Sequence, residues 1–255
     1  MPVLSVNLNK IAVVRNSREG SRPSVIHAAE TVLRAGCRGL TVHPRPDLRH
    51  IRPADVDALA RLLQDHADVE FNIEGNPFAP ANDSGYPGFD ALIESARPAQ
   101  ATLVPDSDDQ LTSDHGWDLS QANAELQAKI ELYQSYGARV SLFMDPDLEQ
   151  IAAAKQHGAD RIELYTGPFA DIFAETDNEE AIQASFNAYN DAARYASQLG
   201  MGVNAGHDLN LDNLPIFCRI LEIDEVSIGH ALISDALDFG LFETTRKYLE
   251  VLHTS

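Results

Sequence analysis

The chain has few cysteines, few basic residues and no long apolar run. Its 255 residues include two cysteines, Cys37 and Cys218, so no disulfide framework is expected and both thiols are predicted to be reduced. There are 19 Lys and Arg and 39 Asp and Glu, and the formal net charge of −20 disfavours nucleic acid and anionic membranes as partners. No apolar run approaches the roughly twenty residues of a membrane span, and the first residues do not resemble a secretory signal. We therefore expect a cytoplasmic protein that binds neither nucleic acid nor membrane.

Short β-branched segments alternate with longer amphipathic segments along the chain. Eight predicted strands cover residues 3–7, 39–43, 69–74, 101–104, 139–143, 161–165, 201–204 and 225–228. Five predicted helices, with apolar residues spaced three and four apart, cover residues 24–35, 53–65, 119–136, 148–157 and 178–199. Gly36, Gly137, Gly158 and Gly200 follow four of these helices, where a left-handed residue commonly ends a helix.

This alternation predicts a parallel sheet of the α/β class. Eight units of roughly thirty residues match a (β/α)8 TIM barrel of about 250 residues. The length suffices for a single domain over residues 1–255 that needs no disulfide or metal for stability. A doubly wound open sheet is the alternative, but its glycine-rich turn is missing, because Leu8, Asn9 and Lys10 follow the first strand.

Polar residues stand at the carboxyl ends of the predicted strands, where a TIM barrel has its active site. They are Asn7, Asn9, Lys10, His43, Arg45, Glu74, Asp106, Asp145, Glu163, Asn204, His207 and His230. Any one histidine there could be a hydrogen-bonded wall residue. Three histidines and two glutamates at one mouth indicate a functional site.

Two kinds of catalysis fit this ring less well. A Zn²⁺ or Mn²⁺ centre of His and Glu ligands is one alternative, but the first strand has no His-x-His pair. A Schiff-base mechanism needs a desolvated lysine, and of the four lysines only Lys10 lies near a strand end. We therefore expect no metal site and no covalent lysine catalysis.

Two segments are suited to binding phosphate. Segment 43–51 is the densest basic patch and contains His43, Arg45, Arg49 and His50; its alternative is a surface loop whose arginines pair with Asp47 and Asp55. Segments 204–208 and 227–230 offer glycine N–H groups after the last two strands, the usual phosphate site of such barrels. The two cradles predict two phosphorylated small-molecule substrates or one bisphosphate.

Eight motifs occur in a fixed order between Val6 and about Leu237. They are Val6-Asn-Leu-Asn-Lys-Ile-Ala12 followed by Arg15-Asn16, His43 to Ile51, Asn72-Ile-Glu74, Leu103-Val-Pro105, Val140-Ser-Leu-Phe143, Ile162-Glu163, Val203-Asn-Ala-Gly-His207 and Ile228-Gly-His230. Together they resemble the pyridoxine 5′-phosphate synthase family. The resemblance implies a TIM barrel that works without a metal or organic cofactor, typically as a homo-octamer. It also implies a reaction that closes the pyridine ring of vitamin B6, by condensing 3-amino-2-oxopropyl phosphate with 1-deoxy-D-xylulose 5-phosphate.

The resemblance also implies roles for individual residues. His43 and Glu74 are expected to accept protons, His207 to donate one, and Glu163 to stabilise charged intermediates. The residues expected to hold the deoxyxylulose phosphate are Arg45, His50 and Thr112. Those expected to hold the amino ketone phosphate are Asn7, Arg18, Gly229 and His230. Each step of the ring closure moves a proton, which histidines and buried carboxylates can do near neutral pH.

The chain departs from the common family pattern at several positions beside the expected site. Asn9 and Lys10 replace an Asp-His pair, and Asp208 replaces the glycine after the catalytic histidine. We expect these three residues to contact substrate. Tyr165 replaces a histidine, and Ser234-Asp235 replaces Gly-Arg. Loops 75–89 and 105–118 are candidate lids over the site.

Two other functions remain as alternatives. A phosphosugar isomerase or epimerase on the same barrel needs only one phosphate cradle, and a non-catalytic sensor needs no proton-transfer residues. The second cradle and the polar strand ends favour the synthase over both.

Overall fold

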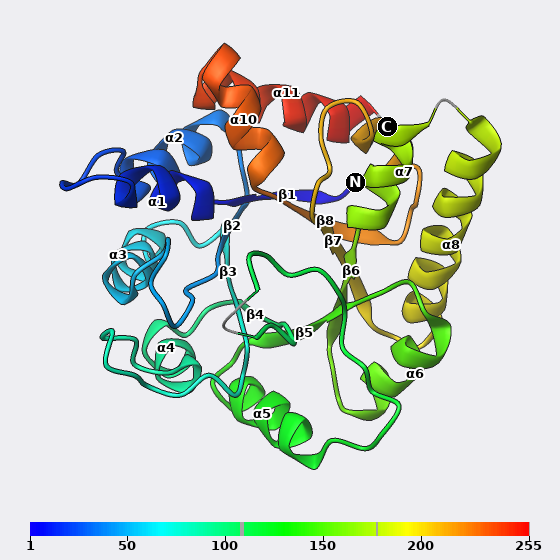
Figure 1. The fold of residues 1–255 in the computed structure, drawn as a ribbon, viewed down its shortest axis with the longest axis horizontal. Coiled ribbons are helices and arrows are strands. Elements are labelled where there is room, and N and C mark those ends of the chain that lie inside the picture. Colours follow the sequence, from blue (N-terminus) through cyan, green and yellow to red (C-terminus); the bar gives the residue numbers. More distant parts are fainter. Residues whose placement is uncertain (108–109, 177, 255) are drawn as a thin grey trace.

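A closed barrel of eight parallel strands forms the centre of the computed structural model, which describes residues 1–107, 110–176 and 178–254 (Figure 1). The strands are β1 (Val3–Asn7), β2 (Gly39–Val42), β3 (Glu70–Gly75), β4 (Gln100–Leu103), β5 (Arg139–Met144), β6 (Arg161–Tyr165), β7 (Gly202–Gly206) and β8 (Ile223–Ile228). They follow chain order around the ring, and β8 closes it by pairing with β1. The predicted TIM barrel is confirmed, and the open doubly wound sheet is wrong.

Helices surround the ring of strands. They are α1 (Asn9–Asn16), α2 (Val25–Ala35), α3 (Pro53–Leu63), α4 (Phe89–Ala96), α5 (Ala124–Ser135), α6 (Leu148–Gln156), α7 (Gly167–Glu175), α8 (Glu179–Gln198), α9 (Leu214–Phe217), α10 (His230–Phe239) and α11 (Leu241–Thr254). The five predicted helices correspond to α2, α3, α5, α6 and α8. The glycines predicted to end four of them all have positive φ, between 75° and 109°.

Six helices, α1, α4, α7, α9, α10 and α11, were not among the predicted ones, and of the five that were, α5 differs most from its predicted start. The helix begins at Ala124, five residues after the predicted position, because the Asn123 side chain accepts a hydrogen bond from the Leu126 N–H and caps it there. Leu119 lies in the preceding loop, although it is buried. Apolar spacing therefore extended the predicted helix into a segment that packs without being helical.

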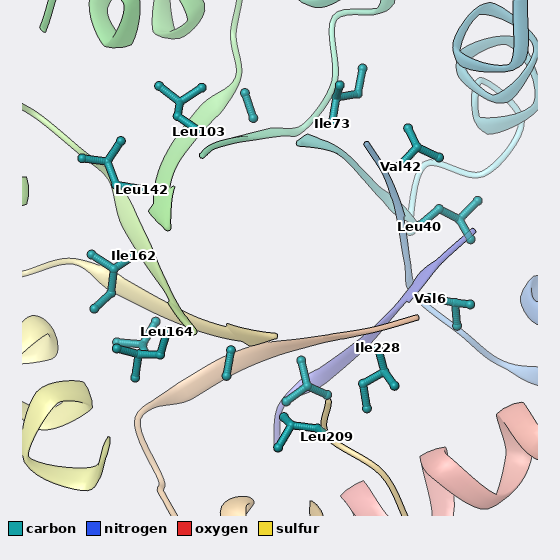
Figure 2. Close-up of a cluster of buried hydrophobic side chains, with 14 of the residues drawn as sticks. Val6, Leu40, Val42, Ile73, Leu103, Leu142, Ile162, Leu164, Leu209 and Ile228 are labelled. Carbon is teal, nitrogen blue, oxygen red and sulfur yellow. The ribbon is translucent and has the colours of Figure 1, made fainter. Parts of the chain in front are cut away.

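The strands alternate between an apolar outer face and a polar inner face. Leu40 and Val42 of β2 belong to the ring of apolar side chains outside the strands (Figure 2). Between them, Thr41 hydrogen-bonds to Ser5 of β1 inside the barrel, with 2.7 Å between the hydroxyl oxygens. Successive side chains of a strand point to opposite faces, so the hydrophobic core lies between barrel and helices while the barrel interior is lined with polar groups.

Both cysteines are buried free thiols, as predicted. In the described part of the chain, no helix combines the length and apolar character that a membrane crossing needs.

Replacing Phe89 with alanine is expected to destabilise the fold by about 3 to 5 kcal/mol, since a buried aromatic side chain leaves a cavity. Phe89 is fully buried, packs against Tyr133 with ring centroids 5.6 Å apart, and fills the space beside Gly75 at the end of β3. Urea unfolding followed by circular dichroism measures the change. Leu221→Ala is the control, because Leu221 is 90% exposed; equal losses for the two variants would contradict the packing role of Phe89.

Candidate active site

A cavity of about 460 Å³ opens at the carboxyl ends of the strands. It is lined by Asn7, Asn9, Lys10, His43, Arg45, His50, Glu74, Thr112, Glu163, His207, Asp208, Gly229 and His230, among others. These are all the residues with a predicted catalytic or binding role except Arg18, which is exposed beyond the end of α1 and does not line the cavity. Three other residues of the predicted ring, Asp106, Asp145 and Asn204, do not line it either. Asn204 lies in the middle of β7, and its amide donates to Gln100 and Glu225 inside the barrel. Sequence reasoning did not assign Ser113, Phe143 and Ser227, which also line the cavity.

Two buried carboxyl groups lie in this cavity. Glu74 Oε2 accepts a hydrogen bond from Asn7 Nδ2 at 3.3 Å and lies 3.9 Å from His43 Nδ1. Burial, followed by the negative charge of Asp106, raises the pKa of Glu74 to about 8. Burial also raises the pKa of Glu163 well above its usual value, and the charges of Glu74 and Glu225 add to the effect. Both carboxyl groups therefore hold protons at a pH where exposed ones are ionised.

The position of Glu163 depends on a glycine of the neighbouring strand. A Cβ atom on Gly206 would lie 2.4 Å from Glu163 Oε1, which no side chain can tolerate without movement. Gly206 directly precedes His207. The end of β7 therefore leaves room for the Glu163 carboxyl group and also carries the His207 side chain.

The pKa values of His43 and His207 are lowered, whereas those of the two glutamates are raised. Burial lowers the pKa of His43 well below its usual value, and the positive charge of Arg45 lowers it further. Burial also lowers the pKa of His207. The ring of His207 is held edge-on by Phe143 and Tyr165, with centroids 5.4 and 5.5 Å away. The variant residue Tyr165 thus forms part of the apolar wall around His207.

The backbone at His207 is in an unusual conformation. His207 and Asp208 have φ values of 83° and 57°, in the left-handed region that residues other than glycine rarely adopt. The Thr166 hydroxyl lies at the start of α7, 2.7 Å from the Gly206 carbonyl oxygen and also within hydrogen-bond distance of the His207 carbonyl oxygen. Thr166 therefore supports the turn that points His207 into the cavity.

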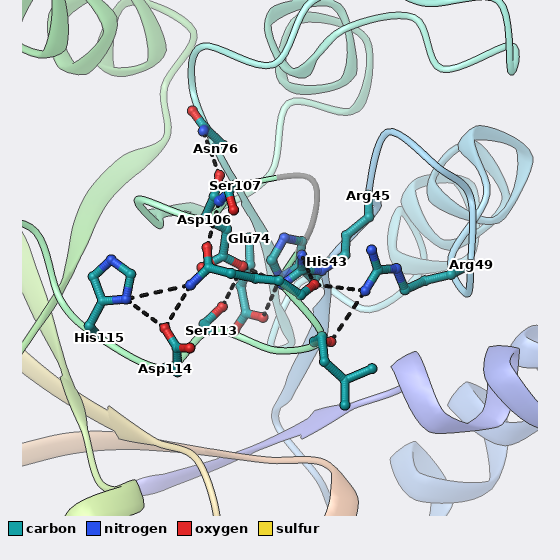
Figure 3. A network of polar contacts seen from close by, with 12 residues as sticks. His43, Arg45, Arg49, Glu74, Asn76, Asp106, Ser107, Ser113, Asp114 and His115 are labelled. Atoms are coloured by element: carbon teal, nitrogen blue, oxygen red, sulfur yellow. Dashed lines mark hydrogen bonds and ion pairs between the residues drawn. The ribbon is translucent and has the colours of Figure 1, made fainter.

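The first phosphate cradle contains arginines that are already paired (Figure 3). Arg45 forms an ion pair with Asp106, and its Nη1 donates to the Gln110 carbonyl oxygen at 3.1 Å. Arg49 donates to the same carbonyl at 2.8 Å and pairs with Asp47 at 2.6 Å. The alternative that these arginines belong to a surface loop and pair with aspartates therefore holds for Arg49, which pairs with Asp47. Arg45, in contrast, is 4% exposed and lines the cavity.

Asp106 is held in place from two sides. Its Oδ2 accepts from the Ser113 hydroxyl at 2.7 Å, and its carbonyl oxygen accepts from Asn76 Nδ2 at 2.7 Å. Its Oδ1 is buried without a hydrogen-bond partner among the described residues. Asp106 is the second residue of the candidate lid 105–118, in which residues 108 and 109 lie outside the described part of the chain.

The second cradle lies at the amino end of α10. Gly229 precedes the helix, and a Cβ atom there would lie 3.1 Å from Asn7 Cβ, so glycine allows β1 and the loop after β8 to approach closely. A helix amino terminus presents unpaired N–H groups to an anion. The N–H groups at the start of α10 and the His230 side chain are therefore suited to a phosphate.

Two other features bear on what the molecule can bind: its potential metal ligands and a second hollow. No group of three or more His, Cys, Asp or Glu side chains that could hold a metal ion is found in residues 1–107, 110–176 and 178–254. A larger, more open hollow of about 720 Å³ lies at the opposite end of the barrel, beside Arg61, Arg97 and Pro98. None of the predicted catalytic or binding residues lines it, and this end of a TIM barrel usually serves stability.

The chain is similar to known proteins over almost its full length. The sequence model of the family described as "Pyridoxal phosphate biosynthesis protein PdxJ" matches residues 4–254. The chain belongs to this family. A curated relative from Xanthomonas oryzae pv. oryzae, named pyridoxine 5′-phosphate synthase, is 53% identical over 253 residues, which cover 99% of this chain and 97% of the relative. A relative of the same name from Xylella fastidiosa is 50% identical over 250 residues, covering 98% and 94% of the two chains.

Solved structures confirm the fold at low identity. The crystal structure of KGPDC from Streptococcus mutans has a TM-score of 0.62 and 13% identity, and the match covers 99% of this chain and 98% of that one. Membership of the PdxJ family therefore rests on the sequence relatives, whereas this structure supports the barrel alone.

Because burial raises the pKa values of the buried carboxyl groups, we expect the free energy of unfolding to fall as the pH rises. Glu225 of β8 is 3% exposed, and burial raises its pKa from 4.5 to about 7. Between these values the unfolded chain has lost this proton while the folded chain keeps it, so the contribution of Glu225 to the free energy of unfolding decreases up to about pH 7. Glu225→Gln should remove that part of the pH dependence in urea unfolding at pH 5 and pH 8. Glu250→Gln, on the surface of α11, is the control; identical pH dependence in wild type and Glu225→Gln would contradict the prediction.

Proposed function

We propose that the protein is a pyridoxine 5′-phosphate synthase. It condenses 3-amino-2-oxopropyl phosphate with 1-deoxy-D-xylulose 5-phosphate and releases pyridoxine 5′-phosphate, inorganic phosphate and water. The observation that carries the proposal is that four proton-transfer groups, three of them buried and the fourth, His207, half-buried, lie between the two proposed anion-binding ends of one cavity. Curated relatives over almost the full length of the chain bear the name of this enzyme, which supports the proposal.

His43 and Glu74 form the acid–base pair at one side of the cavity. Because burial keeps His43 neutral, it is ready to accept a proton when the imine forms between the amine and the ketone. Glu74, with a pKa of about 8, carries a proton at neutral pH and accepts one only after it has given its own away. The 3.9 Å between His43 Nδ1 and Glu74 Oε2 allows a proton to pass between them with little movement.

His207 and Glu163 act at the other side. His207 is proposed to deliver a proton to a leaving oxygen after it has collected one from substrate, since burial keeps it neutral in the free protein. Glu163 stabilises the cationic intermediates of the imine chemistry. Phe143 and Tyr165 keep water away from His207, which protects an imine from hydrolysis.

The two cradles give each substrate its own end of the cavity. Arg45, His50 and Thr112 are proposed to hold the deoxyxylulose phosphate, and Gly229 and His230 the amino ketone phosphate. In the same cavity Asn7 is proposed to contact the amino ketone phosphate, and Asn9, Lys10 and Asp208 are proposed to contact the substrates. The role expected for Arg18 stays a prediction, because its side chain does not line the cavity in this single chain.

We propose further that the whole chain is a single domain that works in the cytoplasm, as a homo-octamer and without a metal or organic cofactor. Two buried free thiols and the family resemblance support this setting. A phosphosugar isomerase would leave the second cradle without a use, so the synthase accounts for more of the site.

Purified, chelator-treated protein should form a product with the ultraviolet absorption of pyridoxine 5′-phosphate when both substrates are supplied. Glu74→Gln should fold normally and lose about 10² to 10⁴ in turnover, because an amide cannot take up a proton at neutral pH. Turnover that requires added metal would overturn the cofactor-free proposal. An undiminished rate in Glu74→Gln would remove Glu74 from the mechanism.

Replacing Arg45 with alanine should weaken binding of the deoxyxylulose phosphate about 10- to 150-fold, the cost of one charge-assisted hydrogen bond of about 1.5 to 3 kcal/mol. Binding of the amino ketone phosphate should change far less, because its cradle lies at α10. Titration calorimetry with each substrate separates the two effects, and Arg246→Ala on the surface of α11 is the control. Equal weakening for both substrates would show that the cradles are wrongly assigned.

A further inference from the structure

A line of polar side chains crosses the barrel interior from Glu163 on β6 to Ser5 on β1. Thr102 Oγ1 lies 3.4 Å from Glu163 Oε2 and 3.1 Å from Asn72 Oδ1. Asn72 Nδ2 donates to Thr41 Oγ1 at 3.4 Å, and Thr41 Oγ1 lies 2.7 Å from Ser5 Oγ. Each of the five residues is at most 3% exposed.

The Thr102 hydroxyl has two polar neighbours and a single proton. A hydroxyl can donate one hydrogen bond and can accept others. Asn72 Oδ1 has no other donor among the described residues, and it cannot itself donate. The shorter of the two contacts is the one to Asn72, so the Thr102 proton points there and a buried amide oxygen is satisfied.

Only one arrangement then gives Glu163 a hydrogen bond to Thr102. If Glu163 were ionised, its Oε2 would face the Thr102 oxygen as a second acceptor unless Thr102 turned its proton to the carboxylate, and Asn72 Oδ1 would then lose its donor. If Glu163 is protonated, its O–H donates to Thr102 Oγ1 and every link of the line has a donor and an acceptor. In the described part of the chain, Thr102 is also the only hydrogen-bond partner of the Glu163 carboxyl group.

We propose that Thr102 is a positioning residue that accepts a hydrogen bond from protonated Glu163, and that the line through Asn72 keeps this carboxyl group neutral in the free protein. The proposal builds on the proposed function, in which Glu163 stabilises cationic intermediates. With its proton directed at Thr102, Glu163 turns the other oxygen, Oε1, toward Gly206 and the cavity. An uncharged acceptor oxygen thus faces the substrate at the start of the cycle.

The charged groups around Glu163 favour the same state. Glu74 of β3 and Glu225 of β8 are the carboxyl groups that act on it from other strands, and both are buried. His207, after β7, also lines the cavity and is kept neutral by burial. Ionisation of Glu163 would place a negative charge among groups that do not compensate it, and would take the Thr102 proton away from Asn72.

Infrared spectroscopy of the free protein tests the proposal without substrate, so its outcome is independent of whether the proposed activity is found. At neutral pH the wild type should show a protonated carboxyl C=O band that is missing from Glu163→Gln. In Thr102→Val, which keeps the side-chain shape but removes the hydroxyl, the titration midpoint of this band should fall by up to about one pH unit, the worth of one neutral hydrogen bond. Thr102→Ser, which restores the hydroxyl, should titrate like the wild type.

Two further variants complete the design. Asn72→Leu removes the acceptor of the Thr102 proton and frees the hydroxyl to donate to the carboxylate, so the midpoint should fall there too. Ser141→Ala is the matched control, since Ser141 on β5 is a buried hydroxyl with no hydrogen-bond partner among the described residues. A wild type without the band overturns the proposal, as does a midpoint that stays or rises in Thr102→Val. If Thr102→Val does not fold, an unchanged midpoint in Asn72→Leu overturns it.

Discussion

Glu74, Glu163 and Glu225 enter one barrel interior from β3, β6 and β8, where too little water reaches them to stabilise three negative charges. The nearby His43 and His207 are under the same constraint, because burial penalises a positive charge as well. Burial therefore shifts protons from the imidazoles, their usual carriers, to the carboxyl groups, which are usually ionised. In the free protein the carboxyl groups hold protons and the imidazoles do not, which is the reverse of their ordinary order in water.

This inverted order suits a reaction that moves many protons between two substrates. A neutral imidazole can accept at once, and a protonated carboxyl group can give, without a charge having first to be created in a dry site. The pKa of Glu74, about 8, is close enough to neutrality for the group to change state during a cycle. Glycine contributes by allowing the close approach: Gly206 leaves room for Glu163, and Gly229 leaves room for Asn7.

The parts of the fold and site that sequence could predict are those with a local signal. Strands with one apolar face, glycines with positive φ after helices, and polar residues at strand ends all depend on a few consecutive residues. They located the barrel and most of the charged and polar residues that line the cavity. The helices α1, α4, α7, α9, α10 and α11 were not among the five predicted; two of them, α1 and α10, begin at Asn9 and His230, which the sequence had assigned to the site. Arg18 shows the limit of a resemblance, which carries a residue type to a position but does not show where its side chain lies.

Asp106 and Thr102 show what a local signal cannot supply, because each acts across the barrel on a residue far away in the sequence. Asp106 neutralises Arg45, 61 positions before it, and the Gln110 carbonyl oxygen occupies a further donor of the same guanidinium. A substrate phosphate that binds Arg45 therefore replaces contacts that the free protein already makes, and its net gain is smaller than that of a phosphate meeting an unpaired arginine. The arrangement keeps a buried cation compensated while the site is empty. It also ties Gln110 to Arg45, so we expect phosphate binding at Arg45 to be coupled to the position of Gln110.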